Sequence, residues 1–104
     1  MFCTFGELLR KIRTENNLTL VEMSKILDID NSLLGKIENN IRNPTEEIIE
    51  KISEKFNSNF EDLIIASYSD RFVDSYNRCP KELKEKIVKS FLYKIDNEVK
   101  EPSK

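Results

Sequence analysis

The chain has 104 residues, of which 35 % are charged and 38 % hydrophobic, and its formal net charge at pH 7 is −2. This length suits one small domain with an appendage, and the composition is typical of a soluble helical protein. The chain has no His, the commonest general base and metal ligand, and Gly6 and Gly35 stand alone rather than in a phosphate-binding loop. An enzyme is therefore the least supported class, and no metal or cofactor is expected.

The sequence contains no segment suited to a membrane. The longest apolar run, residues 63–66, is too short to span one, and no apolar signal core precedes the basic residues near position 10. Cys3 and Cys79 lie far apart and are expected to be reduced. We therefore expect a cytoplasmic protein without a membrane partner. The small negative charge still allows DNA binding through a local basic patch.

The first predicted helix begins after Thr4, which has the capping-box spacing to Glu7. It should end near Asn16. Four apolar residues at helical spacing give it one inward face: Phe5, Leu8, Leu9 and Ile12.

Residues 18–44 predict two short helices joined by a tight turn. Thr19 and Glu22 form a second capping box, and Asp30 can cap the next helix. The inward residues are expected to be Met23, Ile26 and Leu27 in the first helix and Leu34 and Ile37 in the second. The outward residues of the second helix are expected to be Asn31, Ser32 and Lys36. A short helix with such amide, hydroxyl and amine groups on its outer face can enter a DNA major groove.

Two more helices complete the first part of the chain. Thr45 is placed to cap a helix with four inward residues, Ile48, Ile49, Ile52 and Phe56. Asn59 and Asp62 indicate the start of a fifth helix that should continue to about residue 66. We therefore predict an all-α fold whose residues 1–67 form a five-helix domain.

Residues 68–104 are predicted to form a separate C-terminal helical hairpin. A short helix over residues 70–78 is followed by Pro80, which suits a first helical turn, and by a long helix over residues 81–100. The hairpin carries a broad apolar stripe: Phe72, Tyr76, Leu83, Ile87, Val88, Phe91, Leu92 and Ile95. Two helices cannot bury this stripe alone. It either forms a homodimer interface, which we favour, or packs on the N-terminal domain of its own chain.

The stretch LTLVEMSKILDIDNSLLGKIENNIRNPTEEIIEKISEKF (residues 18–56) resembles the phage-repressor (XRE or Cro-like) helix-turn-helix family. With FGELLRKIRTENN upstream, the resemblance covers about residues 4–66. Three positions depart from the family pattern. Leu20 stands where the family usually has a Gln that braces a phosphate, whereas Asp28 and Asn40 stand where it usually has Gly. Asp and Asn tolerate the left-handed backbone conformation best among non-Gly residues, so the fold should be preserved.

The resemblance implies roles for particular residues. Asn31, Ser32 and Lys36 would contact bases, because Asn can pair with adenine and Lys with guanine. The backbone phosphates would be contacted by Thr19, Asn39, Asn40, Arg42 and Asn43. Arg13 and Glu38 match an ion pair that fixes the second helix of the motif against the first helix of the domain.

The predicted function is a sequence-specific transcriptional regulator that binds double-stranded DNA. A dimeric repressor of a near-palindromic operator is expected, because an N-terminal helix-turn-helix with a C-terminal hairpin resembles the layout of SinR-like regulators. The alternative is a protein-interaction module that forms a heterodimer with a related regulator and antagonises its DNA binding. Leu20 and the acidic balance favour the alternative. The outward polar residues of the second helix and Arg42 favour the DNA binder.

Overall fold

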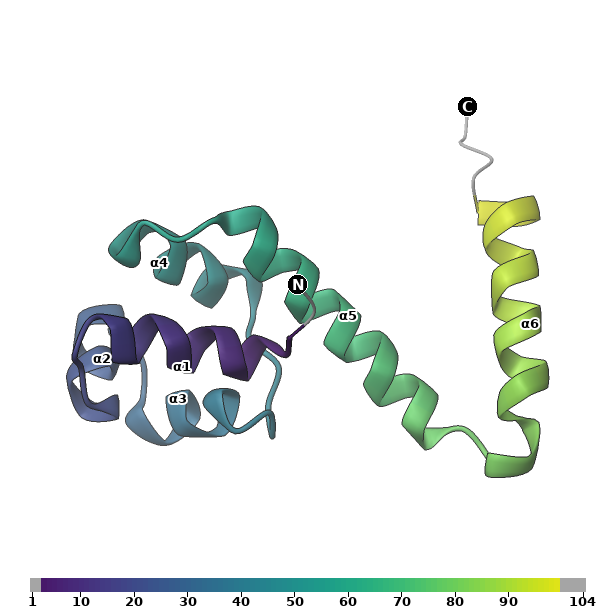
Figure 1. The fold of residues 1–104 in the computed structure, drawn as a ribbon, viewed down its shortest axis with the longest axis horizontal. Helices are drawn as coiled ribbons and strands as arrows, with labels where there is room; N and C mark the ends of the chain where they lie inside the picture. Colours follow the sequence, from purple (N-terminus) through teal and green to yellow (C-terminus); the bar gives the residue numbers. More distant parts are fainter. Residues whose placement is uncertain (1–2, 100–104) are drawn as a thin grey trace. The chain divides into compact units, whose positions relative to one another are not determined.

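The computed structural model describes residues 3–99, with the side chains of residues 3–97, and these residues form helices joined by short turns (Figure 1). The helices are α1 (Phe5–Glu15), α2 (Leu20–Leu27), α3 (Asn31–Glu38), α4 (Glu46–Phe56), α5 (Phe60–Arg78) and α6 (Lys84–Lys94). A 3-10 turn (Lys81–Leu83) precedes α6, and a π-helical turn (Ile95–Val99) follows it. The predicted all-α class is confirmed. Lys100, the expected last residue of the final helix, lies outside the described residues.

The N-caps predicted from the sequence are confirmed for the first five helices. In each, a side-chain oxygen accepts the backbone N–H three residues on, and the five caps are Thr4, Thr19, Asp30, Thr45 and Asn59. Glu7 and Glu22 return a hydrogen bond to the cap backbone, which completes two capping boxes. Each cap contributes about 1 kcal/mol to helix stability.

Asp28 and Asn40 adopt the left-handed backbone conformation, with φ of 56° and 62°. At both positions the phage-repressor family, which the sequence resembles, usually has glycine. Asn17 and Asn57 end helices α1 and α4 in the same conformation. Asn and Asp therefore occupy the left-handed positions at which glycine is the commonest residue in other proteins.

The chain divides into two compact units, Met1–Phe72 and Val73–Lys104. The core of the first unit is built from all five of its helices. It comprises Phe5, Leu9, Met23, Leu27, Leu34, Ile37, Ile48, Ile49, Ile52, Leu63 and Ala66. The residues expected to face inward in α1, α3 and α4 are all in this core or packed against it.

One inward assignment was wrong. Ile26 is 42 % exposed, and the inward side of α2 is formed instead by Met23, Ser24 and Leu27. The small Ser24 side chain satisfies its hydroxyl by donating to the carbonyl of Val21 at 2.7 Å. At helical spacing Met23, Leu27 and Ser24 lie on one side of α2, so with that side turned inward Ile26 lies on the flank that faces solvent.

The helix break expected between residues 66 and 70 is absent, because α5 runs without interruption from Phe60 to Arg78. No Gly or Pro interrupts this segment. Two side chains beyond the expected break bind the first unit. Asp70 Oδ2 accepts the backbone N–H of Phe5 at 2.8 Å, and Arg71 Nη2 donates to the carbonyl of Pro44 at 2.8 Å. The first compact unit accordingly extends to Phe72 rather than to residue 67.

The second unit contains the last turns of α5, the turn at Cys79 and Pro80, and α6, which is consistent with the expected C-terminal helical hairpin. The Lys84 ammonium lies 4.8 Å from the centroid of the Tyr76 ring, which links the two helical segments. No described helix has the length and apolar character needed to cross a membrane.

Candidate nucleic-acid interface

Helix α3 has a buried side and an exposed side. Leu34, Ile37 and Glu38 are buried, whereas Asn31, Ser32 and Lys36 are exposed. The spacing explains this division, because residues 34, 37 and 38 lie on one helical face and residues 32 and 36 on the other. Ser32 and Lys36 therefore share the outward surface of a helix whose inner side is anchored in the core, and Asn31 is exposed beside Ser32 in the first turn of that helix.

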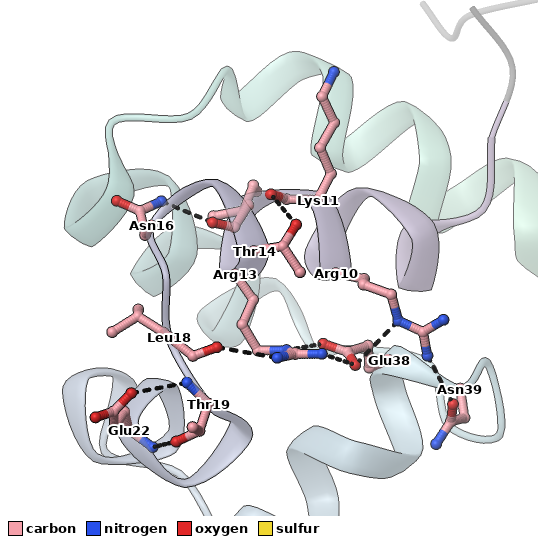
Figure 2. Close-up of polar contacts among 11 residues, drawn as sticks. Arg10, Lys11, Arg13, Thr14, Asn16, Leu18, Thr19, Glu22, Glu38 and Asn39 are labelled. Atoms are coloured by element: carbon pink, nitrogen blue, oxygen red, sulfur yellow. Dashed lines mark hydrogen bonds and ion pairs between the residues drawn. The ribbon is translucent and has the colours of Figure 1, made fainter.

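An ion pair fixes the end of α3 against α1 (Figure 2). Arg13 donates from Nε to Glu38 Oε2 at 2.7 Å and from Nη2 to Glu38 Oε1 at 3.0 Å. Its Nη1 donates to the carbonyl of Leu18 at 3.0 Å, so the same guanidinium also holds the loop before α2. The Glu38 side chain is only 3 % exposed. The ion pair expected from the resemblance is thus present. Its two parallel hydrogen bonds fix the relative orientation of the Arg13 and Glu38 side chains as well as their distance.

Burial and the arginines act on Glu38 in opposite directions. Burial by itself would raise the pKa of the carboxyl group. The hydrogen bonds and charge of Arg13, followed by those of Arg10, outweigh burial and hold the Glu38 pKa below its usual value. The hydrogen bond from Arg13 to Glu38 likewise raises the Arg13 pKa. Glu38 is therefore the ionised centre of a cluster that ties α1 to α3.

The predicted phosphate-contact residues surround the two ends of this motif. Thr19, at the start of α2, uses its side-chain oxygen as the N-cap. Asn39 Oδ1 accepts from Arg10 Nη2 at 3.2 Å, and Asn40 Oδ1 accepts from the backbone N–H of Gly6 at 3.1 Å. These bonds use oxygens, so a phosphate would have to be met by the amide N–H or hydroxyl groups. Arg42 and Asn43 are exposed in the following loop.

The model of the helix-turn-helix family matches residues 9–63, more than half of the chain. This chain belongs to the helix-turn-helix family, of the phage-repressor (XRE) type. No curated protein and no solved structure gives a significant match to it. Family membership supports a DNA-binding regulator, with α2 and α3 as the two helices of the motif and α3 as its recognition helix.

Sequence reasoning missed the role of Gly6 in this helix-turn-helix domain. A Cβ atom at Gly6 would overlap the carbonyl oxygen of Glu38 and would lie 2.7 Å from Asn40 Oδ1. A glycine is therefore needed for α1 to approach the end of the recognition helix. No local pattern marks this position, because the contact joins residues more than thirty apart in the chain.

Gly35, in the middle of the recognition helix, is different. A Cβ atom there would meet only Leu20 Cδ1, at 3.9 Å, which is an ordinary contact. Packing within the protein therefore does not require glycine at this position, although Gly in a helix interior costs about 1 kcal/mol relative to Ala.

The predicted interface residues of the hairpin are mostly exposed. Phe91 is 48 % exposed, and only Val88 is half-buried among those on α6. Phe72 belongs to the first compact unit, and the other members of the stripe belong to the second. Among the described residues, no group of three His, Cys, Asp or Glu side chains is placed to hold a metal ion.

Proposed function

We propose that this helix-turn-helix protein is a sequence-specific transcriptional repressor, cytoplasmic and dimeric, that places α3 in the DNA major groove. The observation that carries the proposal is the outward surface of α3, where Asn31, Ser32 and Lys36 are exposed while the opposite side is anchored by the core and by Glu38. Amide and amine groups held this way match the donors and acceptors on base edges.

Gly35 fits the same proposal. It lies three residues after Ser32 and four after Asn31, so it is a neighbour of both on the helix surface. Because packing within the protein leaves room for a side chain there, we assign the glycine to close approach of the DNA. Asn39, Asn40, Arg42, Asn43 and Thr19 flank this surface and would contact phosphates, which position a protein on DNA without reading its sequence.

The dimer in this proposal is supported by the exposed apolar side chains of the second unit. Exposed members include Tyr76, Leu83, Ile87, Phe91, Leu92 and Ile95. Burial of one large apolar side chain contributes roughly 1.5–3 kcal/mol, and monomers seldom leave large apolar patches in water. A symmetric pair would present two recognition helices, and the operator half-sites would then lie about 34–36 Å apart or a multiple of that distance.

A second candidate is an antagonist that pairs through the same apolar side chains with a related regulator. Leu20 favours it, because this side chain packs against the core at the position where the family usually places a phosphate-bracing Gln. The loss of that Gln removes one backbone contact for each bound chain.

Selection of bound sequences from a random duplex pool, repeated at two salt concentrations, tests the proposed function. The DNA-binding proposal predicts recovery of one inverted-repeat sequence at both concentrations. Recovery of unrelated sequences, with binding that vanishes at the higher salt, would favour the antagonist.

A further inference from the structure

Arg10 joins the Arg13–Glu38 pair from the preceding turn of α1 (Figure 2). Its Nε donates to Glu38 Oε1 at 3.3 Å, and its Nη2 donates to Asn39 Oδ1 at 3.2 Å. These two hydrogen bonds point in different directions, so together they fix the orientation of the Arg10 guanidinium group. An Arg side chain has five N–H donors, so three of them are not engaged by the described residues.

The cluster carries one uncompensated positive charge. Two guanidinium groups share the single carboxylate of Glu38, and the inner pair is largely removed from solvent, with Arg13 only 19 % exposed. The Arg10 side chain is 56 % exposed. Because the short inner pair neutralises itself, the remaining charge is presented to solvent at Arg10. Arg10 therefore helps to keep the buried Glu38 carboxylate ionised, while its own side chain stays accessible from solvent.

The position of this charge is set by its bond to Asn39. Asn39 is the C-cap of α3 and lies three residues after Lys36 and seven after Ser32, which is the spacing of one helical face. Arg10 therefore stands at the edge of the outward surface of α3, although it comes from α1. Glu7, one turn earlier on α1, is held in the capping box by the backbone N–H of Thr4.

We propose that Arg10 is a DNA-backbone contact, in which its free N–H donors bind a phosphate beside the end of α3. Asn39 and Glu38 would pre-orient the guanidinium, so that little side-chain freedom is lost on binding. This inference rests on the proposed function and adds a cation that neither the family pattern nor the sequence indicated. Among the proposed phosphate contacts it adds a second full positive charge to that of Arg42, in a chain whose net charge is negative.

The test compares Arg10→Gln with Lys11→Gln in the full chain. Lys11 is the next residue of α1 but lines a shallow groove with Asn59 and Asp62 instead of bonding to α3. Binding of the selected duplex and of a scrambled duplex is measured by fluorescence anisotropy between 50 and 200 mM salt. Arg10→Gln should weaken both duplexes by a similar factor. It should lower the slope of log K against log salt by about 0.9 per bound chain. Between 50 and 200 mM salt the variant should therefore lose about 3.5-fold less affinity than the parent.

Lys11→Gln should keep the parent slope, and Arg10→Lys should restore most of it, because the slope depends on charge. A melting temperature measured for each variant separates a folding defect from lost contact. An unchanged slope in Arg10→Gln, or an equal fall in Lys11→Gln, would overturn the inference while leaving the proposed function in place. A parent protein that binds no duplex at all would overturn both.

Discussion

The Cα of Gly6 lies so close to the last residue of the recognition helix that a Cβ atom would overlap the carbonyl oxygen of Glu38. The same Glu38 binds Arg13 through its side chain, so α1 contacts the last residue of α3 through Gly6, near the start of α1, and through Arg13, near the end of α1. The orientation of the outward surface of α3 therefore depends on α1 as well as on α2 and α3.

The first prediction concerns this close approach. Gly6→Ala should destabilise the fold by about 1–3 kcal/mol, because the backbone of Glu38 cannot move aside as a flexible side chain could. Gly35→Ala is the matched control, and it should stabilise the fold by up to about 1 kcal/mol, because its Cβ atom has room. Chemical denaturation of the two variants and the parent measures both effects. Equal effects of the same sign would contradict the assignment.

The second prediction concerns the Arg13–Glu38 pair. Glu38→Ala should destabilise the fold by about 3 kcal/mol, since it leaves Arg13 largely buried without its partner. Adding Arg13→Ala should cost little more, because the two residues share one interaction. Denaturation of the four proteins of the cycle gives the coupling. Fully additive losses would mean that the pair contributes no interaction energy.

The third prediction concerns pH. The Glu38 pKa is lower in the folded protein than in the unfolded chain, so this carboxylate stabilises the fold fully above the unfolded pKa of about 4.3. That contribution is lost as the pH falls through the folded pKa. The difference in melting temperature between the parent and Glu38→Gln should therefore be constant near neutrality and shrink below about pH 4. A difference that stays constant down to pH 3 would show that Glu38 is not the titrating group.

Much of the first unit could be predicted because its signals are local. Thr4, Thr19 and Asp30 mark helix starts within four residues of sequence. Asp28 and Asn40 adopt the left-handed conformation at positions where the family resemblance places Gly and where their residue types tolerate it. The Arg13–Glu38 pair was found through the family resemblance, since nothing local links the two residues.

The misses share one physical cause, which is that a tertiary contact decided them. The attachment of the middle of α5 to the first unit depends on bonds from Asp70 and Arg71 to distant backbone groups, which no local pattern indicates. The exposure of Ile26 depends on which side of α2, that of Ser24 or that of Ile26, faces the core, and the role of Gly6 depends on the end of α3. From the sequence alone Arg10 cannot be distinguished from the other basic residues of α1. The structure distinguishes it by its bond to Asn39.

The fourth prediction concerns assembly. Phe91→Glu places a charge within the exposed apolar side chains of α6, so it should convert a dimer into a monomer and weaken operator binding. Sedimentation of the parent and the variant at tens of micromolar is the measurement, and Tyr93→Glu, at an exposed residue of α6 outside the predicted interface, is the control. A parent that sediments as a monomer would exclude the homodimer at that concentration.

The most direct test of the central claim, that α3 reads DNA sequence, compares Lys36→Ala with Arg42→Ala on the selected operator and on single-base variants of it. Lys36→Ala should weaken operator binding by about 1–3 kcal/mol and relax the preference at one base pair. Arg42→Ala should weaken all sequences alike and lower the salt slope by about one unit. If Lys36→Ala leaves every base preference unchanged and both variants bind the operator as tightly as the parent, α3 is not the reading helix.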